Sequence, residues 1–312
     1  MINLDVITYG EAMAMFVADD LGHLSEVNHF TKRVAGAELN VATGLARLNF
    51  NVAWLSRVGN DSFGQFVLNH LTKEKISHDL VVTDNDHPTG FLIKSKEING
   101  KDPKVEYFRK NSAASFLSIN DFSKEHFHNA RHLHLTGILA ALSESSYQLS
   151  LYTSDFMRNL GKTVSFDPNL RPSLWKSTDD MVHKTNQLAF KSNWFLPGIE
   201  EGRILTSLNE PEQIADFYLK NGVEIVIIKL GKEGAYFKDK NHHQNIIPAQ
   251  LVENVIDTVG AGDGFAVGII SALLEKKSIE DAVRRGNYIA SLAIQSVGDS
   301  DGLPNRQQLG NY

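Results

Sequence analysis

The stretch of sequence that decides the fold is Val223-Glu224-Ile225-Val226-Ile227-Ile228-Lys229. Its nearly continuous run of β-branched apolar residues is typical of a strand that helices cover on both faces, whereas a strand with one face in water alternates polar and apolar residues. Strands of the first kind belong to largely parallel sheets. We therefore predict that residues 223–229 form a central strand of such a sheet.

Other β-rich runs precede this strand and alternate with longer segments of helical spacing. Three of them lie at residues 131–136, 162–167 and 193–196, and residues 1–10 also have the composition of a buried strand. Helical spacing of apolar residues is clear at 38–48. This alternation predicts an α/β fold with a doubly wound, largely parallel sheet covered by helices.

Two segments, at about residues 11–33 and 88–111, break the alternation. The second contains the runs 90–94 and 105–109, which alternate like antiparallel strands and are separated by the turn-rich loop 99–103. We expect these segments to form a small β-lid that projects from the main sheet. The chain has no internal repeat, low-complexity tract or linker, so we treat all 312 residues as one domain.

The overall composition excludes several classes of protein. Hydrophobic residues make up 42% of the chain and charged residues 22%, as in ordinary globular proteins. The net charge of −6 gives no basic field that would attract nucleic acid. The absence of cysteine excludes disulfides and thiolate catalysis, and it agrees with a cytoplasmic location. The first residues do not resemble a signal peptide, and no apolar run approaches the ~20 residues of a membrane span, so we expect no membrane partner.

The segment richest in chemistry is Asp257-Thr258-Val259-Gly260-Ala261-Gly262-Asp263-Gly264, which precedes an apolar helical run. Glycines at the start of a helix leave backbone amides free to bind an anion. We expect the amides of Gly260, Ala261 and Gly262 to stabilise a transferring phosphoryl group while Asp263 accepts the proton of the attacking hydroxyl. The spacing alone leaves an alternative open, in which Asp263 is only a favourable acid in the first helical turn.

Residues 257–263 resemble the Asp-Thr-x-Gly-Ala-Gly-Asp signature of the ribokinase-like (PfkB) carbohydrate kinases. Residues 34–42, Val-Ala-Gly-Ala-Glu-Leu-Asn-Val-Ala, resemble the N-terminal Gly-Gly-x-x-x-Asn-x-Ala motif of the same family. Two motifs in the family's order are far more specific than one glycine motif. The resemblance implies a ribokinase-like fold with a β-lid and an ATP-dependent transfer of phosphate to a sugar hydroxyl.

Three further stretches, 105–109, 166–175 and 196–206, resemble the branch of this family that phosphorylates 2-keto-3-deoxygluconate, a sugar acid. The resemblance assigns four residues to the substrate: Gly36, Tyr107, Arg109 and Arg171. Physical chemistry agrees, because a planar guanidinium binds a carboxylate through two parallel hydrogen bonds. Each arginine also has a structural alternative, as a solvated charge on an edge strand for Arg109 and as a cap of a strand-to-helix turn for Arg171.

The resemblance also suggests residues for the nucleotide. Lys229, Gly231 and Gly234 match the family's turn after the strand that we expect to be central, and glycines there permit close approach of the backbone to ATP. Without the resemblance, the same turn is equally typical of a hairpin leading into residues 235–238. Asn169 and Asn287 match positions near the nucleotide, although either is also a common turn or helix-packing residue.

Metal ions are expected from the resemblance, with one departure from the family pattern. The family's Asn-x-x-Glu motif aligns with residues 198–201, where Gly198 replaces Asn and Glu201 remains. We therefore expect Mg²⁺ to be bound mainly through ATP phosphates and water, with Glu201 outside its direct ligands. Relatives hold a monovalent cation through positions that match Asp257 and Val259, which suggests K⁺.

Other functions and assemblies remain open. One alternative is a related kinase for fructose, ribose or another keto-deoxy acid, and another is a non-catalytic sensor of a sugar or nucleotide, which would need no base at Asp263. Relatives commonly pair through the lid, and the apolar lid residues Phe91, Ile93 and Phe108 agree with a homo-oligomer of this kind.

Overall fold

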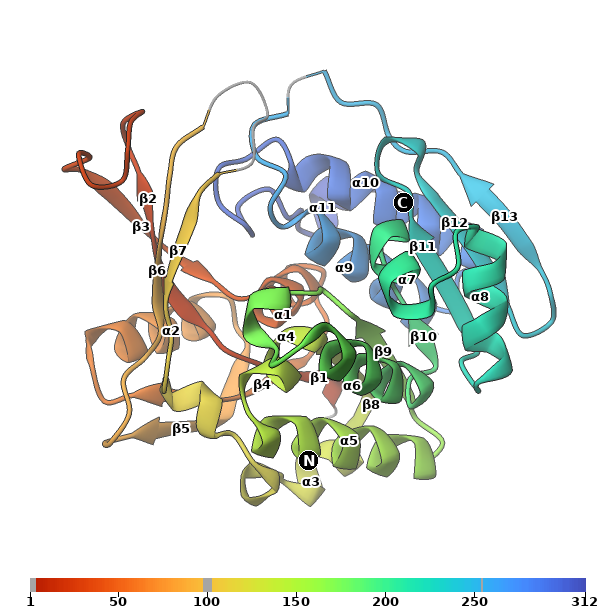
Figure 1. Ribbon diagram of the computed structural model, residues 1–312, viewed down its shortest axis with the longest axis horizontal. Coiled ribbons are helices and arrows are strands. Elements are labelled where there is room, and N and C mark those ends of the chain that lie inside the picture. The colour runs from red at the N-terminus through yellow and green to blue at the C-terminus, as the bar shows by residue number, and fades with distance from the viewer. Residues whose placement is uncertain (1–3, 98–102, 254) are drawn as a thin grey trace.

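The computed structural model describes residues 4–97, 103–253 and 255–312, so parts of the expected first strand and of the expected loop 99–103 lie outside the described residues. Its main sheet has nine strands in the order β13-β12-β11-β10-β9-β8-β1-β4-β5 (Figure 1). Their bounds are β1 Leu4–Tyr9, β4 Val52–Gly59, β5 Ser77–Asp84, β8 Ala130–Thr136, β9 Thr163–Asp167, β10 Trp194–Phe195, β11 Ile225–Lys229, β12 Ala235–Asp239 and β13 Gln244–Ile247. The strands from β5 to β11 are parallel, and β12 and β13 continue the sheet in antiparallel fashion. The predicted doubly wound α/β fold is confirmed.

Strand β11, which corresponds to the predicted strand at residues 223–229, lies inside the sheet but not at its centre. β11 pairs with β10 in parallel and with β12 in antiparallel fashion, whereas the middle of the sheet is β9. The prediction of a central position was therefore wrong. Its apolar sequence reflects burial on both faces: Val226 and Ile228 pack in one hydrophobic cluster and Ile227 in the other. Burial of this kind does not depend on the number of strands on either side.

Helices cover both faces of the main sheet and separate its core into two clusters. On one face lie α1 Ala37–Arg47, α2 Ser62–Lys73, α9 Ala261–Leu274, α10 Ile279–Ala293 and α11 Arg306–Leu309. On the other lie α3 Lys124–Asn129, α4 Gly137–Leu142, α5 Glu144–Asn159, α6 Thr178–Phe190, α7 Ile199–Thr206 and α8 Pro211–Lys220. Short 3-10 turns occur at Ala113–Phe116, Ile119–Asp121, Pro172–Leu174 and Gly231–Glu233. None of the helices in the described ranges combines the length and hydropathy needed to cross a membrane.

A second sheet of four strands stands beside the main one, at the left of Figure 1, in the order β3-β2-β6-β7. Its strands are β2 Met13–Ala18, β3 Phe30–Ala35, β6 Phe91–Lys94 and β7 Val105–Phe108, which come from the two segments that break the strand-helix alternation. The pairs β2–β3 and β6–β7 are antiparallel, and β2–β6 is parallel. This sheet, called the lid below, has its own small core around Met15, Val17 and Leu92.

Candidate active site

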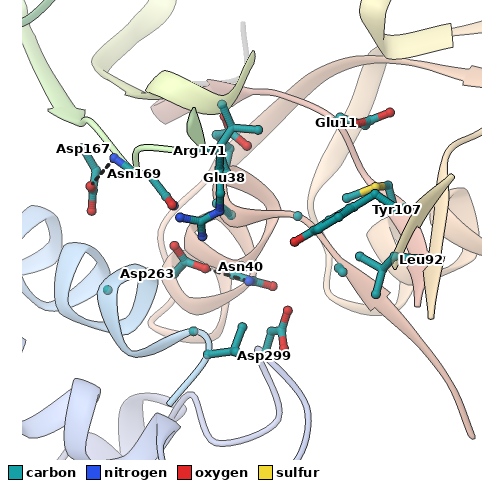
Figure 2. A pocket seen from close by; sticks show the side chains of 18 of the residues that line it. Glu11, Glu38, Asn40, Leu92, Tyr107, Asp167, Asn169, Arg171, Asp263 and Asp299 are labelled. Carbon is teal, nitrogen blue, oxygen red and sulfur yellow. Dashed lines mark hydrogen bonds between the residues drawn. The ribbon is translucent and has the colours of Figure 1, made fainter. Parts of the chain in front are cut away.

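A cavity of about 470 Å³ lies between the lid and the carboxyl ends of the parallel strands (Figure 2). This edge is where doubly wound sheets bind ligands, because loops from several strands converge there. The cavity brings together eleven of the residues singled out in the sequence: Gly36, Tyr107, Arg109, Asn169, Arg171, Glu201, Lys229, Val259, Gly260, Gly262 and Asp263. They come from lid, main-sheet loops and the start of α9.

Five other candidate residues lie outside the lining of this cavity. Ala261 begins α9 between two lining glycines, and Asp257 lies just upstream, paired with a lysine described below. Gly231 starts the 3-10 turn after β11. Gly234 has φ of 103°, and a Cβ there would lie 2.0 Å from the Ile247 carbonyl oxygen, so only glycine fits. Asn287 donates hydrogen bonds to the carbonyls of Ile247 and Pro248, at 3.1 and 2.9 Å, and so holds the segment that follows β13.

The turn before α9 requires glycine for two reasons. Gly260 has φ of 85°, in the left-handed region that other residues rarely adopt. A Cβ at this position would also lie 2.4 Å from the carbonyl oxygen of Asp299. The turn therefore directs the first amides of α9, a fourteen-residue helix, toward the cavity. Amides and helix dipole together favour an anion here.

Asp263 lies in the first turn of α9 with its carboxylate at the cavity. The Asn40 amide donates a hydrogen bond of 2.8 Å to this carboxylate (Figure 2). Burial raises the pKa of Asp263 well above its usual value, the Asn40 hydrogen bond opposes the increase, and the charges of Asp167 and Asp299 add to it. A carboxylate with a raised pKa is a stronger base, which suits proton abstraction from a hydroxyl.

Lys229 ends β11 beside the same turn. Its ammonium pairs with the Asp167 carboxylate at 2.6 Å and lies 3.6 Å from the point where a Cβ of Gly262 would be. A cation is thus held within reach of an anion at the start of α9. Asp167 was not predicted as a site residue, because nothing in its local sequence identifies β11 as its neighbour across β10.

Arg109 and Arg171 are in different electrostatic situations. Arg109 forms an ion pair with Glu11, whose side chain is only 1% exposed and also accepts a hydrogen bond from the Ser112 hydroxyl. Burial raises the pKa of Glu11, and the charge of Arg109 opposes this increase. Arg171 donates to the Leu170 carbonyl at 3.0 Å and forms no ion pair within the described parts of the chain. Arg171 therefore keeps a charge that an anionic ligand can neutralise, and Figure 2 shows it extending toward Asp263.

Glu201 organises the loop that carries Asn169 and Arg171. One carboxylate oxygen accepts the amide of Leu170 at 2.8 Å, and the other accepts the amide of Gly198 at 2.6 Å. Asn169 itself has φ of 38°, and its amide donates to Asp167 at 3.1 Å. Glu201, predicted to lie near Mg²⁺, thus fixes the backbone of the loop that carries the predicted substrate residue Arg171.

Glu38 is a second buried acid that was not predicted as a site residue. It lies within the N-terminal motif at residues 34–42, lines the cavity and accepts a hydrogen bond of 2.5 Å from the Thr136 hydroxyl. Burial raises its pKa to about 7. Gly10 follows directly after β1, and a Cβ there would lie 2.4 Å from a carboxylate oxygen of Glu38, so glycine at this position leaves room for the acid.

The comparisons with known proteins identify the class of enzyme. The model of the pfkB family carbohydrate kinases matches residues 3–306, and the chain belongs to this family. It is 52% identical over 312 residues to the 2-dehydro-3-deoxygluconokinase of Bacillus subtilis (strain 168), covering 100% of this chain and 96% of the relative. It is 29% identical over 314 residues to the 5-dehydro-2-deoxygluconokinase of Geobacillus kaustophilus (strain HTA426), covering 99% of this chain and 93% of the relative. The prediction of a carbohydrate kinase is confirmed.

Two solved structures extend this result to the fold. The PfkB protein from Polaromonas sp. JS666 superposes with a TM-score of 0.92 at 46% identity, covering 99% of this chain and 100% of that chain. A fructokinase double mutant from Vibrio cholerae O395, bound to fructose, ADP and a potassium ion, gives a TM-score of 0.85 at 28% identity. The match covers 98% of this chain and 97% of that chain. The ribokinase-like fold is therefore confirmed.

Proposed function

We propose that this enzyme transfers the γ-phosphoryl group of ATP to the terminal hydroxyl of 2-keto-3-deoxygluconate (2-dehydro-3-deoxygluconate), giving 2-keto-3-deoxy-6-phosphogluconate and ADP. The observation that carries the proposal is the guanidinium of Arg171, which has no ion-pair partner among the described residues and lies in the same cavity as Asp263. A sugar acid supplies a carboxylate that Arg171 can bind and a hydroxyl that Asp263 can deprotonate. The 52% identity to a kinase named for this substrate supports the choice.

The chemistry follows from the start of α9. The substrate hydroxyl gives its proton to Asp263 as its oxygen attacks the γ-phosphorus, and the bond from that phosphorus to the β–γ bridging oxygen breaks. The amides of Gly260, Ala261 and Gly262 stabilise the charge on the transferring group. The Lys229 ammonium adds a positive charge beside them. ADP leaves with the bridging oxygen.

The nucleotide is assigned to the side of this turn where Lys229 and Asn169 line the cavity, next to the Gly231–Gly234 turn and the segment held by Asn287. Mg²⁺ supplies charge neutralisation on the phosphates when it is bound. The carboxylates nearest to this region already have partners, since Asp167 pairs with Lys229 and Glu201 accepts two amides. This donor set fits an ion held mainly by phosphates and water, with Glu201 in a supporting position.

The sugar acid is assigned to the opposite wall, which includes the lid. Arg171 binds its carboxylate, while Gly36 and Tyr107 contact the sugar and Arg109, held by Glu11, contributes hydrogen-bond donors. Gly36 has φ of 154°, and a Cβ there would lie 2.7 Å from the Glu11 carbonyl oxygen, so only glycine fits at this point of the cavity wall. A second candidate is 5-dehydro-2-deoxygluconate, because kinases named for it are 26–29% identical to this chain.

A substrate panel tests the proposal. ADP release is measured with ATP, Mg²⁺ and, separately, 2-keto-3-deoxygluconate, 5-dehydro-2-deoxygluconate, gluconate, fructose and ribose, and the mass of each product is recorded. The keto-deoxy acid with its keto group at carbon 2 is expected to give the highest kcat/KM and a product heavier by one phosphate. A clear preference for fructose or ribose contradicts the acid substrate, and ADP release that no sugar stimulates contradicts the kinase activity on this panel.

We also propose a homo-oligomer that forms through the lid, in the cytoplasm. Tyr107 is 48% exposed and Phe108 is 47% exposed. The Phe108 ring stacks on the Phe91 ring, with 4.6 Å between the ring centroids, so the lid presents an aromatic surface. Such surfaces are typical of contacts between proteins. Sedimentation tests this directly: a species of twice the chain mass is expected, and a monomer at all concentrations excludes it.

A further inference from the structure

The side chain of Lys94 reaches from the lid into the loop that precedes α9. Lys94 is the last residue of β6, and its ammonium lies 2.6 Å from an oxygen of Asp257 and 3.1 Å from an oxygen of Asp299. Its side chain is 3% exposed, and those of the two acids are 9% and 10% exposed. A buried lysine with two carboxylate partners is uncommon, because the long side chain is normally solvated.

Both acids belong to the backbone that shapes the anion-binding turn. Asp257 accepts the amide of Val259 at 3.0 Å, one residue before Gly260. Asp299 places its carbonyl oxygen against Gly260, where a Cβ would lie 2.4 Å from it. The Lys94 ammonium therefore joins the lid to the two chain segments that hold Gly260 in place.

A cation is also required here for electrostatic reasons. Asp257 and Asp299 are two buried carboxylates next to a turn that binds a phosphoryl group, and without compensation they would repel it. The ammonium of Lys94 offsets one of these charges and hydrogen-bonds to both.

Of these two acids, Asp257 is the one that the family resemblance assigns to K⁺. In this chain the Asp257 oxygen is already bound to an ammonium, so the residues present do not fit a potassium ion at that carboxylate. The ammonium of Lys94 carries the same single positive charge as K⁺, and it is attached to the lid by the lysine side chain. Nothing in the sequence around residue 94 indicates this pairing, because its partners are 163 and 205 residues away.

We propose that Lys94 replaces the monovalent cation of this site, so that the enzyme needs no K⁺ and its anion-binding turn is ordered by the lid itself. Lys94 is a positioning residue in this scheme, since it acts on the phosphoryl group through the turn at Gly260. The proposal rests on the assignment of that turn to phosphate but not on the identity of the sugar.

The test compares the enzyme with Lys94→Met in KCl and in tetramethylammonium chloride at equal ionic strength. Tetramethylammonium is much larger than K⁺ and has no N–H group, so it replaces neither K⁺ nor the ammonium of Lys94. For the unmodified enzyme we expect kcat and the affinity for Mg·ADP, measured by calorimetry, to differ less than about twofold between the salts. For Lys94→Met we expect both to fall about tenfold or more in tetramethylammonium chloride and to recover in part in KCl, because removal of the ammonium exposes two acids to the ion.

Two further variants separate charge from structure. Lys96→Met changes an exposed lysine two residues along the chain, whose ammonium donates a hydrogen bond to the Asp19 carbonyl, and it is expected to match the unmodified enzyme in both salts. Lys94→Arg keeps the charge and is expected to stay independent of K⁺. KCl should also raise the Tm of Lys94→Met, and leave that of the unmodified enzyme unchanged, relative to the other salt.

Activation of the unmodified enzyme by K⁺ of several-fold would overturn the proposal, and this result needs no variant to fold. Full activity and nucleotide affinity of Lys94→Met in tetramethylammonium chloride would overturn it as well. Because nucleotide affinity and Tm are measured without a sugar, both outcomes can be told apart from an error in the sugar substrate.

Discussion

Asn40 donates a hydrogen bond of 2.8 Å to Asp263 across 223 residues of sequence. The first residue lies on α1 and the second on α9, two helices that pack on the same face of the main sheet. The bond joins the two motifs on which the family resemblance rests, and it fixes the orientation of the carboxylate that we assign as the base. The buried acid and its amide partner therefore act as a unit.

Asp263→Asn should lower kcat by about 10² to 10⁴, because the amide cannot accept the hydroxyl proton. It should also raise the Tm. The pKa of Asp263 is raised by burial, so its ionised form costs folding free energy above that pKa, and a neutral amide removes the cost. Steady-state kinetics and thermal melting measure both effects, with the exposed Asp79→Asn as control. Turnover within a few-fold of the unmodified enzyme would exclude the general-base role and favour a sensor.

Asn40→Ala should move the acidic limb of the kcat profile to higher pH. The Asn40 hydrogen bond favours the charged form of Asp263, so its loss raises the pKa of that carboxyl further. A larger fraction of Asp263 is then protonated at each pH on the acidic limb. Exposed Asn69→Ala serves as control. An acidic limb at the same pH in both variants would show that Asp263 does not determine the profile.

Arg171→Ala should raise KM for 2-keto-3-deoxygluconate by about 10- to 100-fold, as expected for one charge-assisted contact. For a neutral sugar that the enzyme also accepts, the increase should be smaller. Arg203→Ala, at an exposed ion pair with Glu200, is the matched control. Equal losses for acid and neutral sugars would mean that Arg171 only shapes the loop through its bond to Leu170.

Arg109→Ala should differ from Arg171→Ala in stability. It leaves the Glu11 carboxylate buried without its cation, which typically costs about 3 kcal/mol of unfolding free energy. Urea denaturation measures this cost, and Glu11→Gln in the same chain should restore part of it. If Arg109→Ala is as stable as the unmodified enzyme, Glu11 is neutral in the folded state and the ion pair is not structural.

Glu38→Gln should stabilise the protein increasingly as pH rises from 5 to 8. The pKa of Glu38 is raised to about 7, so the folded state binds a proton that the unfolded state has lost between its ordinary pKa and pH 7. Stability therefore falls as pH rises through this window and levels off above it. Glutamine does not titrate and still accepts from Thr136. A Tm difference between variant and parent that is constant with pH would contradict the raised pKa.

The fold was predictable wherever local composition reports burial. Apolar runs identified strands β8, β9, β10 and β11, and helical spacing identified α1, because each needs only its own residues. The position of β11 in the sheet was not predictable, since an apolar strand looks the same at any interior position.

The site was predictable only in part. Gly260 to Asp263 stand in one segment whose spacing indicates an anion turn, and this segment does begin α9 at the cavity. The buried pairs Glu11–Arg109, Asp167–Lys229 and Lys94–Asp257 were not found, because each joins residues distant in sequence with no local pattern. Asn40 was within reach, since it is the asparagine of the N-terminal motif. Arg109 and Arg171 were predicted as two equivalent substrate residues. The ion pair between Arg109 and Glu11, which the structure shows, distinguishes them.

The most direct measurement is a competition for limiting ATP. Equal concentrations of 2-keto-3-deoxygluconate, 5-dehydro-2-deoxygluconate, fructose and ribose are mixed with the enzyme, and the products are resolved by phosphorus NMR and mass spectrometry, so that their ratios report kcat/KM. We predict that 2-keto-3-deoxy-6-phosphogluconate is the major product, with the phosphate on the terminal oxygen. A phosphorylated neutral sugar as the major product would contradict the assignment of an acid substrate to Arg171 and Asp263.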